Sequence, residues 1–201
     1  MGDSLKRLEI GGSLSAHELL SISGLLTCAA RAKNYGRHPE NQEIPDDSLD
    51  GMFRALEPLT NVNQEITRCI LSEEEIADDA SPGLRHVRRQ MKITADRVHT
   101  QLNSILNSSR TLLQDAVITM RDGRYCLPVK AEHKSQFPGM VHDQSSTGST
   151  LFIEPMAVIK LNNELRELEL QERKEIEMVL AALSMELVPY VEPIQADFPK
   201  L

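Results

Sequence analysis

The chain has few aromatic side chains and no long apolar run. Its 201 residues include no tryptophan, three tyrosines and four phenylalanines. Aliphatic side chains and methionine must therefore fill the core, a composition that favours helices. No apolar run approaches the roughly 20 residues that span a bilayer, and no apolar stretch follows the basic residues near the N-terminus. We expect a cytoplasmic protein that makes no contact with a membrane.

Cysteine is also scarce, which argues against a disulfide framework or a zinc site. Cys28, Cys69 and Cys126 are far apart, odd in number and without a CxxC spacing. We predict that each is a small buried or half-buried side chain. The six histidines show no spacing of four residues that would place two imidazoles on one helical face, so no metal site is expected.

The net charge of −8 conceals a strong segregation of charge along the chain. Residues 1–82 contain 7 Lys and Arg against 15 Asp and Glu, and residues 154–201 contain 5 against 10. Residues 115–153 are balanced at 4 against 4, whereas residues 83–114 contain 6 against 1. Only one segment is basic, and it lies between two segments of lower charge.

The first 80 residues have the pattern of a small helical subdomain. Ser15 and Glu18 form a capping box that predicts a helix over residues 16–35. The prolines and polar residues of segment 36–47 indicate a loop. Segment 48–71 then predicts two helical pieces, interrupted near Pro58.

Two long helices are predicted beyond this subdomain. Ser81 and Pro82 form a strong start signal for the first helix, and Pro155 precedes the second. The first apolar stripe runs through Leu84, Val87, Met91, Val98, Leu102, Ile105 and Leu112. The second runs through Val158, Leu161, Leu165, Leu168, Ile176, Val179, Leu183 and Leu187, and Glu172 breaks it. Helices of similar length and opposite charge are suited to lie antiparallel as a stalk.

Between these helices the pattern changes to that of strands. Residues 116–120 and 125–129 are rich in β-forming side chains, and Asp122-Gly123 between them predicts a two-residue hairpin turn. Residues 140–143 and 150–153 are two further strand candidates. Pro128 would have to lie on a sheet edge or at a bulge. The predicted fold class is mainly α, with a small β-rich tip carried by two long helices.

Three motifs carry a specific family resemblance: RDGRYCLPVKAEHK, GMVHDQSSTGSTLFIEP and LNNELREL, all within residues 118–168. They resemble the second type of bacterial MutS homologue, here called the MutS type-two family. Weaker similarity covers Ile10 to Ser15 and Ala80 to Pro82. The resemblance implies a helical core portion at 1–80, an ascending lever helix at 81–114 and a clamp tip at 115–154. The descending lever helix and the start of the remaining core would occupy 155–201, so we expect a piece of a longer protein.

For the full-length protein the resemblance implies an ATP-dependent homodimer, with ATP and magnesium in an ABC-type ATPase domain and with a small MutS-related nuclease domain. Its expected partners are branched or duplex DNA, with suppression of recombination, or the rRNA of stalled, collided ribosomes. Post-replicative mismatch repair is the weaker expectation, because the family lacks the mismatch-reading domain of true MutS proteins. These 201 residues contain no G-x-x-x-x-G-K-[ST] motif, so we expect this part to be non-catalytic and without a cofactor.

Two groups of polar residues in the tip are candidate contacts for nucleic acid. Arg121, Arg124, Lys130 and Lys134 alternate with apolar positions and can face phosphates. Ser145, Ser146, Thr147 and Ser149 offer hydroxyls in one loop. A solvated surface and a simple turn are the competing interpretations. A nucleophile-and-base arrangement of Ser145 with His142 and Asp143 is disfavoured, because residues adjacent in sequence seldom converge on one atom.

Other charged and aromatic residues have structural interpretations. The basic residues of the first long helix are Arg85, Arg88, Arg89, Lys92 and Arg97, and the expected acidic partners on the second are Glu164, Glu167, Glu169, Glu172 and Glu175. Tyr125, Phe137 and Phe152 are expected in the core of the small sheet rather than stacked on bases. The alternative function, from a different class, is a protein–protein or self-association module with nucleic acid bound by other domains.

Overall fold

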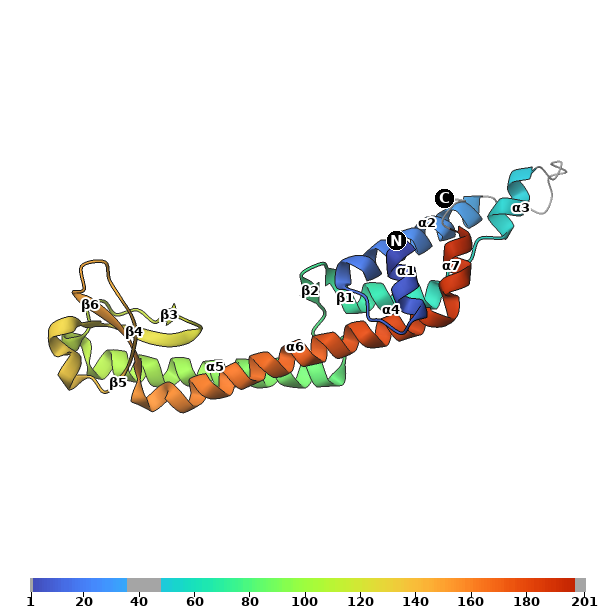
Figure 1. Cartoon of the computed structure of the whole chain (residues 1–201). Helices are drawn as coiled ribbons and strands as arrows, with labels where there is room; N and C mark the ends of the chain where they lie inside the picture. The colour runs from blue at the N-terminus through green and yellow to red at the C-terminus, as the bar shows by residue number, and fades with distance from the viewer. Residues whose placement is uncertain (1, 36–47, 198–201) are drawn as a thin grey trace. The chain divides into compact units, whose positions relative to one another are not determined.

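The computed structural model describes residues 2–35 and 48–197 (Figure 1). The chain is mainly helical with small antiparallel sheets, as predicted. It divides into two compact units, a helical unit of residues 1–85 and 174–201 and a sheet unit of residues 86–173. The long helices α5 (Pro82–Ser108) and α6 (Ile159–Leu187) each contribute to both units. In the described part of the chain, no helix is long and apolar enough to cross a membrane.

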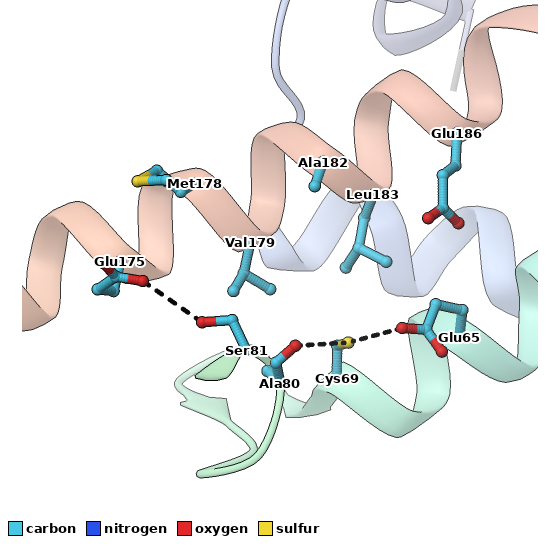
Figure 2. Close-up of a pocket in the computed structure, with 10 residues that line it drawn as sticks. All are labelled: Glu65, Cys69, Ala80, Ser81, Glu175, Met178, Val179, Ala182, Leu183 and Glu186. Carbon is cyan, nitrogen blue, oxygen red and sulfur yellow. Dashed lines mark hydrogen bonds between the residues drawn. The ribbon is translucent and has the colours of Figure 1, made fainter. Parts of the chain in front are cut away.

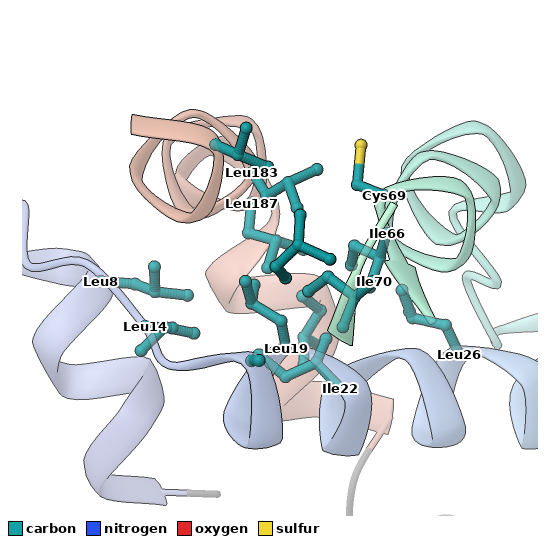
Figure 3. Close-up of a cluster of buried hydrophobic side chains, with 14 of the residues drawn as sticks. Leu8, Leu14, Leu19, Ile22, Leu26, Ile66, Cys69, Ile70, Leu183 and Leu187 are labelled. Atoms are coloured by element: carbon teal, nitrogen blue, oxygen red, sulfur yellow. The ribbon is translucent and has the colours of Figure 1, made fainter. Parts of the chain in front are cut away.

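The helical unit is built around one aliphatic core (Figure 3). Its other elements are α1 (Gly2–Glu9), α2 (Ala16–Tyr35), α3 (Ser48–Arg54), α4 (Thr60–Cys69), β1 (Ile70–Ser72), β2 (Glu75–Ile76), η4 (Val188–Tyr190) and α7 (Val191–Asp197). Leu8, Leu19, Ile22 and Leu187 are fully buried in this core. Helix α1 and the β1–β2 pair were not predicted from the sequence, because both are too short to show a clear period.

The predicted helix starts and breaks in this unit are confirmed. Both halves of the capping box form: the Ser15 backbone N–H donates to Oε2 of Glu18 at 2.9 Å, and the Glu18 N–H donates to Oγ of Ser15 at 3.3 Å. Oγ of Ser81 accepts from the Leu84 N–H at 3.0 Å at the start of α5. Helices α3 and α4 are separated around Pro58. The predicted loop at 36–47 lies outside the described residues.

The sheet unit contains a four-stranded antiparallel sheet. Its elements are η1 (Arg110–Leu112), β3 (Thr119–Arg121), β4 (Arg124–Lys130), η2 (Ala131–Gln136), β5 (Gly139–Gln144), β6 (Thr150–Pro155) and η3 (Met156–Val158). The strand order is β3-β4-β6-β5. Asp122 and Gly123 have φ of 51° and 71°, so the predicted hairpin turn between β3 and β4 is confirmed. The first strand is shorter than predicted and begins at Thr119.

One face of this sheet packs on α5 and the first half of α6 (Figure 1). Buried side chains from both helices and from β4 and β6 form its core; they include Val98, Leu102, Leu127, Val129, Ile153 and Leu161. Phe137 is buried there and Tyr125 packs against it, as predicted. Phe152 is different: it is half-buried on the opposite face, where it pairs with Pro128.

The expectation that Pro128 lies on an edge or at a bulge is wrong. Strand β4 is interior, and Pro128 is in regular register with Phe152 of β6. The carbonyl of Pro128 accepts from the Gln114 N–H at 2.9 Å, on the side away from β6. A residue's N and O point to the same side of a strand, so the missing N–H of proline falls beyond the end of β3 and costs no bond in the β4–β6 ladder.

Within the sheet unit, α5 and α6 run antiparallel and form two of the ion pairs expected between them. Nε of Arg88 lies 2.8 Å from Oε1 of Glu172, and Nη1 of Arg97 lies 4.0 Å from Oε2 of Glu164. The charged group that interrupts the apolar stripe of α6 is therefore matched by an arginine on α5. Arg85, in the helical unit, pairs instead with Asp79 at 3.8 Å.

The cysteine prediction is correct for two of the three side chains. Cys69 and Cys126 are buried, whereas Cys28 is exposed on α2. The expectation for Cys28 was wrong because helix α2 buries a different stripe of its surface, through Leu19, Ile22 and Leu26.

Candidate nucleic-acid interface

The face of the sheet that points away from the helices carries three of the four predicted basic residues. In an antiparallel pair, residues directly opposite each other project to the same face, and along one strand every second residue does so. Arg121 is opposite Arg124, and Lys130 lies six residues further along β4. We call this surface, with Phe152 and Asp143 in register beside it, the outer face of the sheet.

Arg124 is held by a buried carboxylate. Its Nη2 donates to Oε1 of Glu154 at 2.5 Å, and the Glu154 side chain is fully buried. Nε2 of His142 lies 2.6 Å from the other oxygen of Glu154, and Nδ2 of Asn162 donates to Oε1 at 2.7 Å. Glu154 thus ties β4, β5 and α6 to β6.

A β-bulge and a side-chain amide complete this network. Strand β5 shifts its register between Val141 and Asp143, which leaves His142 as an extra residue aimed at Glu154. Asn162 on α6 accepts from the Tyr125 N–H at 3.4 Å and donates to the Tyr125 carbonyl at 3.3 Å. The amide therefore satisfies the backbone of β4 at a point where its pairing with β6 has ended.

The electrostatic effect of this network is to keep Glu154 ionised. Burial raises the pKa of the Glu154 carboxyl, but the hydrogen bonds from Arg124, His142 and Asn162 outweigh burial and hold the pKa below its ordinary value. Burial, reinforced by the charge of Glu154, raises the pKa of the nearby Cys126 thiol to about 11. The carboxylate and the three side chains that bind it are thus a fixed part of the sheet.

Arg121 is oriented by three neighbours. Its Nε lies 3.0 Å from Oδ2 of Asp143, and its Nη1 donates to the carbonyl of Met120 at 2.7 Å. Its guanidinium carbon lies 3.9 Å from the centroid of the Phe152 ring, a cation–π contact. The Arg121 side chain remains 34% exposed.

The two lysines are less constrained. Nζ of Lys130 donates to the carbonyl of Thr111 at 3.4 Å, and Lys130 is half-buried. Lys134 lies on η2 and is exposed. Within the described residues, Lys134 has no ion pair or side-chain hydrogen bond, so its ammonium is available to an external anion.

The predicted hydroxyl loop joins β5 to β6. Oγ of Ser145 accepts from the Thr150 N–H at 3.1 Å, and Oγ1 of Thr147 lies 2.8 Å from Oγ of Ser149. Gly148 has φ of 71°, which closes the turn. Ser146, Thr147 and Ser149 are exposed, so three of the four predicted hydroxyls face solvent.

The residues that organise this surface were not predicted from the sequence. Glu154, Asn162 and Asp143 were not proposed as site residues, and their contacts join strands and a helix that are far apart in the sequence. No local pattern reports such contacts. The polar Asn162 within the LNNELREL helix start, at a position that should face the sheet, was the only signal available.

A second surface lies in the helical unit, between α4, the residues before α5, and α6 (Figure 2). We call it the acidic groove. It has a volume of about 220 Å³. Its floor is apolar, with buried Cys69, Val179 and Leu183, and its rim carries three carboxylates, those of Glu65, Glu175 and Glu186. Among the described residues, no group of three or more His, Cys, Asp or Glu side chains is placed to hold a metal ion.

The thiol of Cys69 lies 3.6 Å from Oε1 of Glu65 in this groove. The hydrogen bond from Arg68 lowers the pKa of Glu65 against the opposing effect of burial, and burial raises the pKa of the Cys69 thiol to about 11. Beside the groove, α6 exposes Met178 and Met185, at 64% and 67%. The helical unit as a whole contains 10 Lys and Arg against 20 Asp and Glu.

Comparison with known proteins places the chain in a family. No family model matches it. It is 63% identical to Endonuclease MutS2 of Lachnoclostridium phytofermentans over 90% of the chain and 24% of that protein. It is 58% and 55% identical to Endonuclease MutS2 of Agathobacter rectalis and of Lachnospira eligens, each over 97% of the chain and about a quarter of the relative. The chain spans about a quarter of the length of these curated relatives. Over that region, the chain belongs to the MutS type-two family.

Proposed function

We propose that the sheet unit is a non-catalytic clamp that contacts the sugar–phosphate backbone of nucleic acid, either branched DNA or the rRNA of a stalled ribosome. One observation carries the proposal: Lys130 lies opposite Thr150, where the loop of exposed hydroxyls ends, and the next residue, Ala131, donates its N–H to the carbonyl of Ser149 at 2.9 Å. Phosphate oxygens are recognised by cations, hydroxyls and backbone amides in this way, without reading base sequence.

The predicted residues have different roles in the proposed interface. Lys134 is exposed and Lys130 has only a long hydrogen bond to a carbonyl, so these two lysines are the proposed phosphate ligands. Ser146, Thr147 and Ser149 are the proposed hydroxyl donors, with Ser145 shaping their loop. Arg124 has a structural role instead, because its guanidinium binds the buried carboxylate of Glu154.

A salt titration tests the proposal. We compare the affinity of the chain for a four-way DNA junction and for purified ribosomes, before and after Lys130→Glu and Lys134→Glu are combined. Each phosphate that a lysine neutralises contributes about 0.9 to the slope of log affinity against log salt for duplex DNA. Loss of two contacts should make the slope shallower by about 1.8.

The matched control changes the same charge elsewhere. Lys6 and Arg31 are exposed in the helical unit and lie outside the proposed surface, so Lys6→Glu with Arg31→Glu should leave the slope nearly unchanged. Unaltered affinity and slope in the Lys130 and Lys134 variant would refute the assignment. Loss of binding to only one of the two ligands identifies the physiological target.

The properties of the full-length protein follow as part of the same proposal. We propose that it is a cytoplasmic homodimer with an ATP- and magnesium-dependent ATPase domain and an endonuclease domain, both outside these 201 residues. The name Endonuclease MutS2, which the relatives carry, supports the endonuclease. The two long helices, α5 with 27 residues and α6 with 29, are proposed as the lever between the clamp and that ATPase.

The acidic groove favours a second candidate function, a protein-interaction or self-association module. Its apolar floor, its three carboxylates and the exposed Met178 and Met185 on α6 are features of surfaces that receive another polypeptide. Sedimentation of the chain at micromolar concentration tests self-association. A stable dimer that Met178→Glu disrupts supports this function, and a monomer at all concentrations argues against it.

A further inference from the structure

The guanidinium group of Arg121 is fixed as a plane rather than left as a mobile charge. The salt bridge to Asp143 and the hydrogen bond to the Met120 carbonyl both engage nitrogens at its edge. The Phe152 ring covers one of its two faces at 3.9 Å. The Arg121 side chain as a whole is 34% exposed, so part of it is open to a ligand.

This arrangement suits a flat ligand better than a phosphate. The carboxylate of Asp143 already offsets the charge of Arg121, and two of the three guanidinium nitrogens have partners. What remains is a planar guanidinium backed by an aromatic ring, in a side chain that is partly exposed. Unpaired bases of DNA and RNA stack on guanidinium planes as they do on aromatic rings.

The strand register places the hydroxyl loop, which could bind the phosphates of such a nucleotide, close to Arg121. Phe152 is two residues beyond Thr150, where the hydroxyl loop ends, and Asp143 is two residues before Ser145, where it begins. A base resting on Arg121 would have its flanking phosphates within the region of the loop hydroxyls. Paired bases inside a continuous duplex are already stacked on their neighbours and cannot use the plane.

We propose that the other face of the Arg121 guanidinium is a stacking site for one unpaired nucleobase, backed by Phe152 and oriented by Asp143. This inference rests on the proposed contact with nucleic acid and adds the ligand class: nucleic acid with a base outside the helical stack, as at a bulge or a loop. Arg121 is then a specificity-determining residue, whereas Lys130 and Lys134 bind paired and unpaired nucleic acid alike.

Binding of the chain to three fluorescein-labelled DNA duplexes tests the site. One is fully paired, the second carries one bulged adenine, and the third carries an abasic nucleotide at the bulge. A stacked base stabilises such complexes by an amount equivalent to about tenfold in affinity, so the chain should bind the bulged adenine about tenfold more tightly than the abasic bulge. Fluorescence anisotropy measures all three dissociation constants.

Two conservative variants separate stacking from charge. Arg121→Lys keeps the positive charge but has no plane, so the preference for adenine should fall to near unity while binding to the paired duplex is retained. Phe152→Leu keeps an apolar side chain without the ring and should reduce the preference to an intermediate value. Thermal unfolding of each variant establishes that the sheet is intact.

The outcomes distinguish this inference from the function on which it rests. Equal affinity of the unaltered chain for the adenine and abasic bulges overturns the stacking site, as does a preference that survives Arg121→Lys. Either result leaves the backbone contact through Lys130 and Lys134 standing if the paired duplex still binds. Absence of binding to all three duplexes overturns both.

Discussion

Arg124 donates from Nη2 to Oε1 of Glu154 across 2.5 Å, and the carboxylate that receives it has no exposed side-chain surface. This pair gives the outer face of the sheet its rigidity, because His142 and Asn162 bind the same carboxylate. Arg124, which the sequence suggests as a phosphate ligand, is therefore already paired with a carboxylate inside the protein. The basic residues free to meet a ligand are those that no buried acid holds.

The first prediction concerns the stability of the sheet unit. Glu154→Gln removes the buried negative charge and one acceptor of its hydrogen bonds, and breaking a buried ion pair costs about 3 to 5 kcal/mol. Because the Arg124 side chain is 17% exposed and can recover some hydration, we expect the free energy of unfolding to fall by about 2 to 4 kcal/mol. Chemical denaturation of the chain measures the change.

A surface glutamate provides the control. Glu132 is 73% exposed beside His133, and surface ion pairs contribute about 0 to 1 kcal/mol. Glu132→Gln should therefore be nearly neutral. Equal effects of the two substitutions would show that the Glu154 network does not stabilise the sheet.

The sequence predicted the elements of this fold better than the contacts among them. Signals that depend on neighbouring residues were reliable: the capping box at Ser15, the start at Pro82 and the hairpin turn at Asp122 all formed. These signals work because they satisfy backbone groups locally. Pro128 was misjudged because its tolerance depends on where the neighbouring strand ends.

The candidate site shows the same division. Alternation along β4 correctly put Arg124 and Lys130 on one face. It did not reveal that Glu154 would neutralise Arg124 or that Asp143 would orient Arg121, since those contacts depend on strand order and on a bulge. Sequence periodicity predicts which face of the sheet a side chain lies on. Whether its charge remains available to a ligand depends on contacts in the tertiary structure.

The second prediction concerns acid stability of the helical unit. Burial raises the pKa of Glu18, but hydrogen bonds from Ser15, Ser4 and Arg7 outweigh it and lower the pKa from 4.5 to about 2. A carboxyl with a lowered folded-state pKa contributes stability above its unfolded pKa and loses it as pH falls through the folded value. We expect a loss of about 1 to 2 kcal/mol between pH 4.5 and about 2.

The variant Glu18→Gln isolates this contribution. It should be less stable than the unaltered chain at pH 7, and the difference between the two should shrink as the pH is lowered through that window. Denaturation at a series of pH values measures the difference. A constant difference down to pH 2 would mean that Glu18 is not the titrating group.

The third prediction concerns two glycines with opposite surroundings. A Cβ on Gly139 would lie 2.2 Å from the backbone oxygen of Glu154, so β5 approaches β6 only because residue 139 has no side chain. Gly139→Ala should destabilise the chain by about 1 to 3 kcal/mol. A Cβ on Gly24, inside α2, would meet no atom within 4 Å beyond its chain neighbours and the helix's own backbone, and Gly24→Ala should stabilise by about 0.5 to 1 kcal/mol. Thermal unfolding distinguishes the two signs, and destabilisation by both would contradict the argument from space.

The fourth prediction concerns thiol reactivity. The thiolate is the reactive form, and burial raises the pKa of Cys69 and of Cys126 to about 11 in each case. With an ordinary thiol pKa near 8.5, such a shift lowers the thiolate fraction at neutral pH by about two orders of magnitude. Cys28 is exposed on α2. We therefore expect a maleimide to label one site quickly and two slowly, as followed by intact mass.

Replacement of the exposed thiol identifies the fast site. Cys28→Ser should abolish the fast phase and leave the two slow additions, whose rates then report opening of the helical unit at Cys69 and of the sheet unit at Cys126. Glu154→Gln weakens only the network around Cys126, so it should accelerate labelling at Cys126 more than at Cys69. Equal acceleration at both cysteines would show that the two units open together rather than independently.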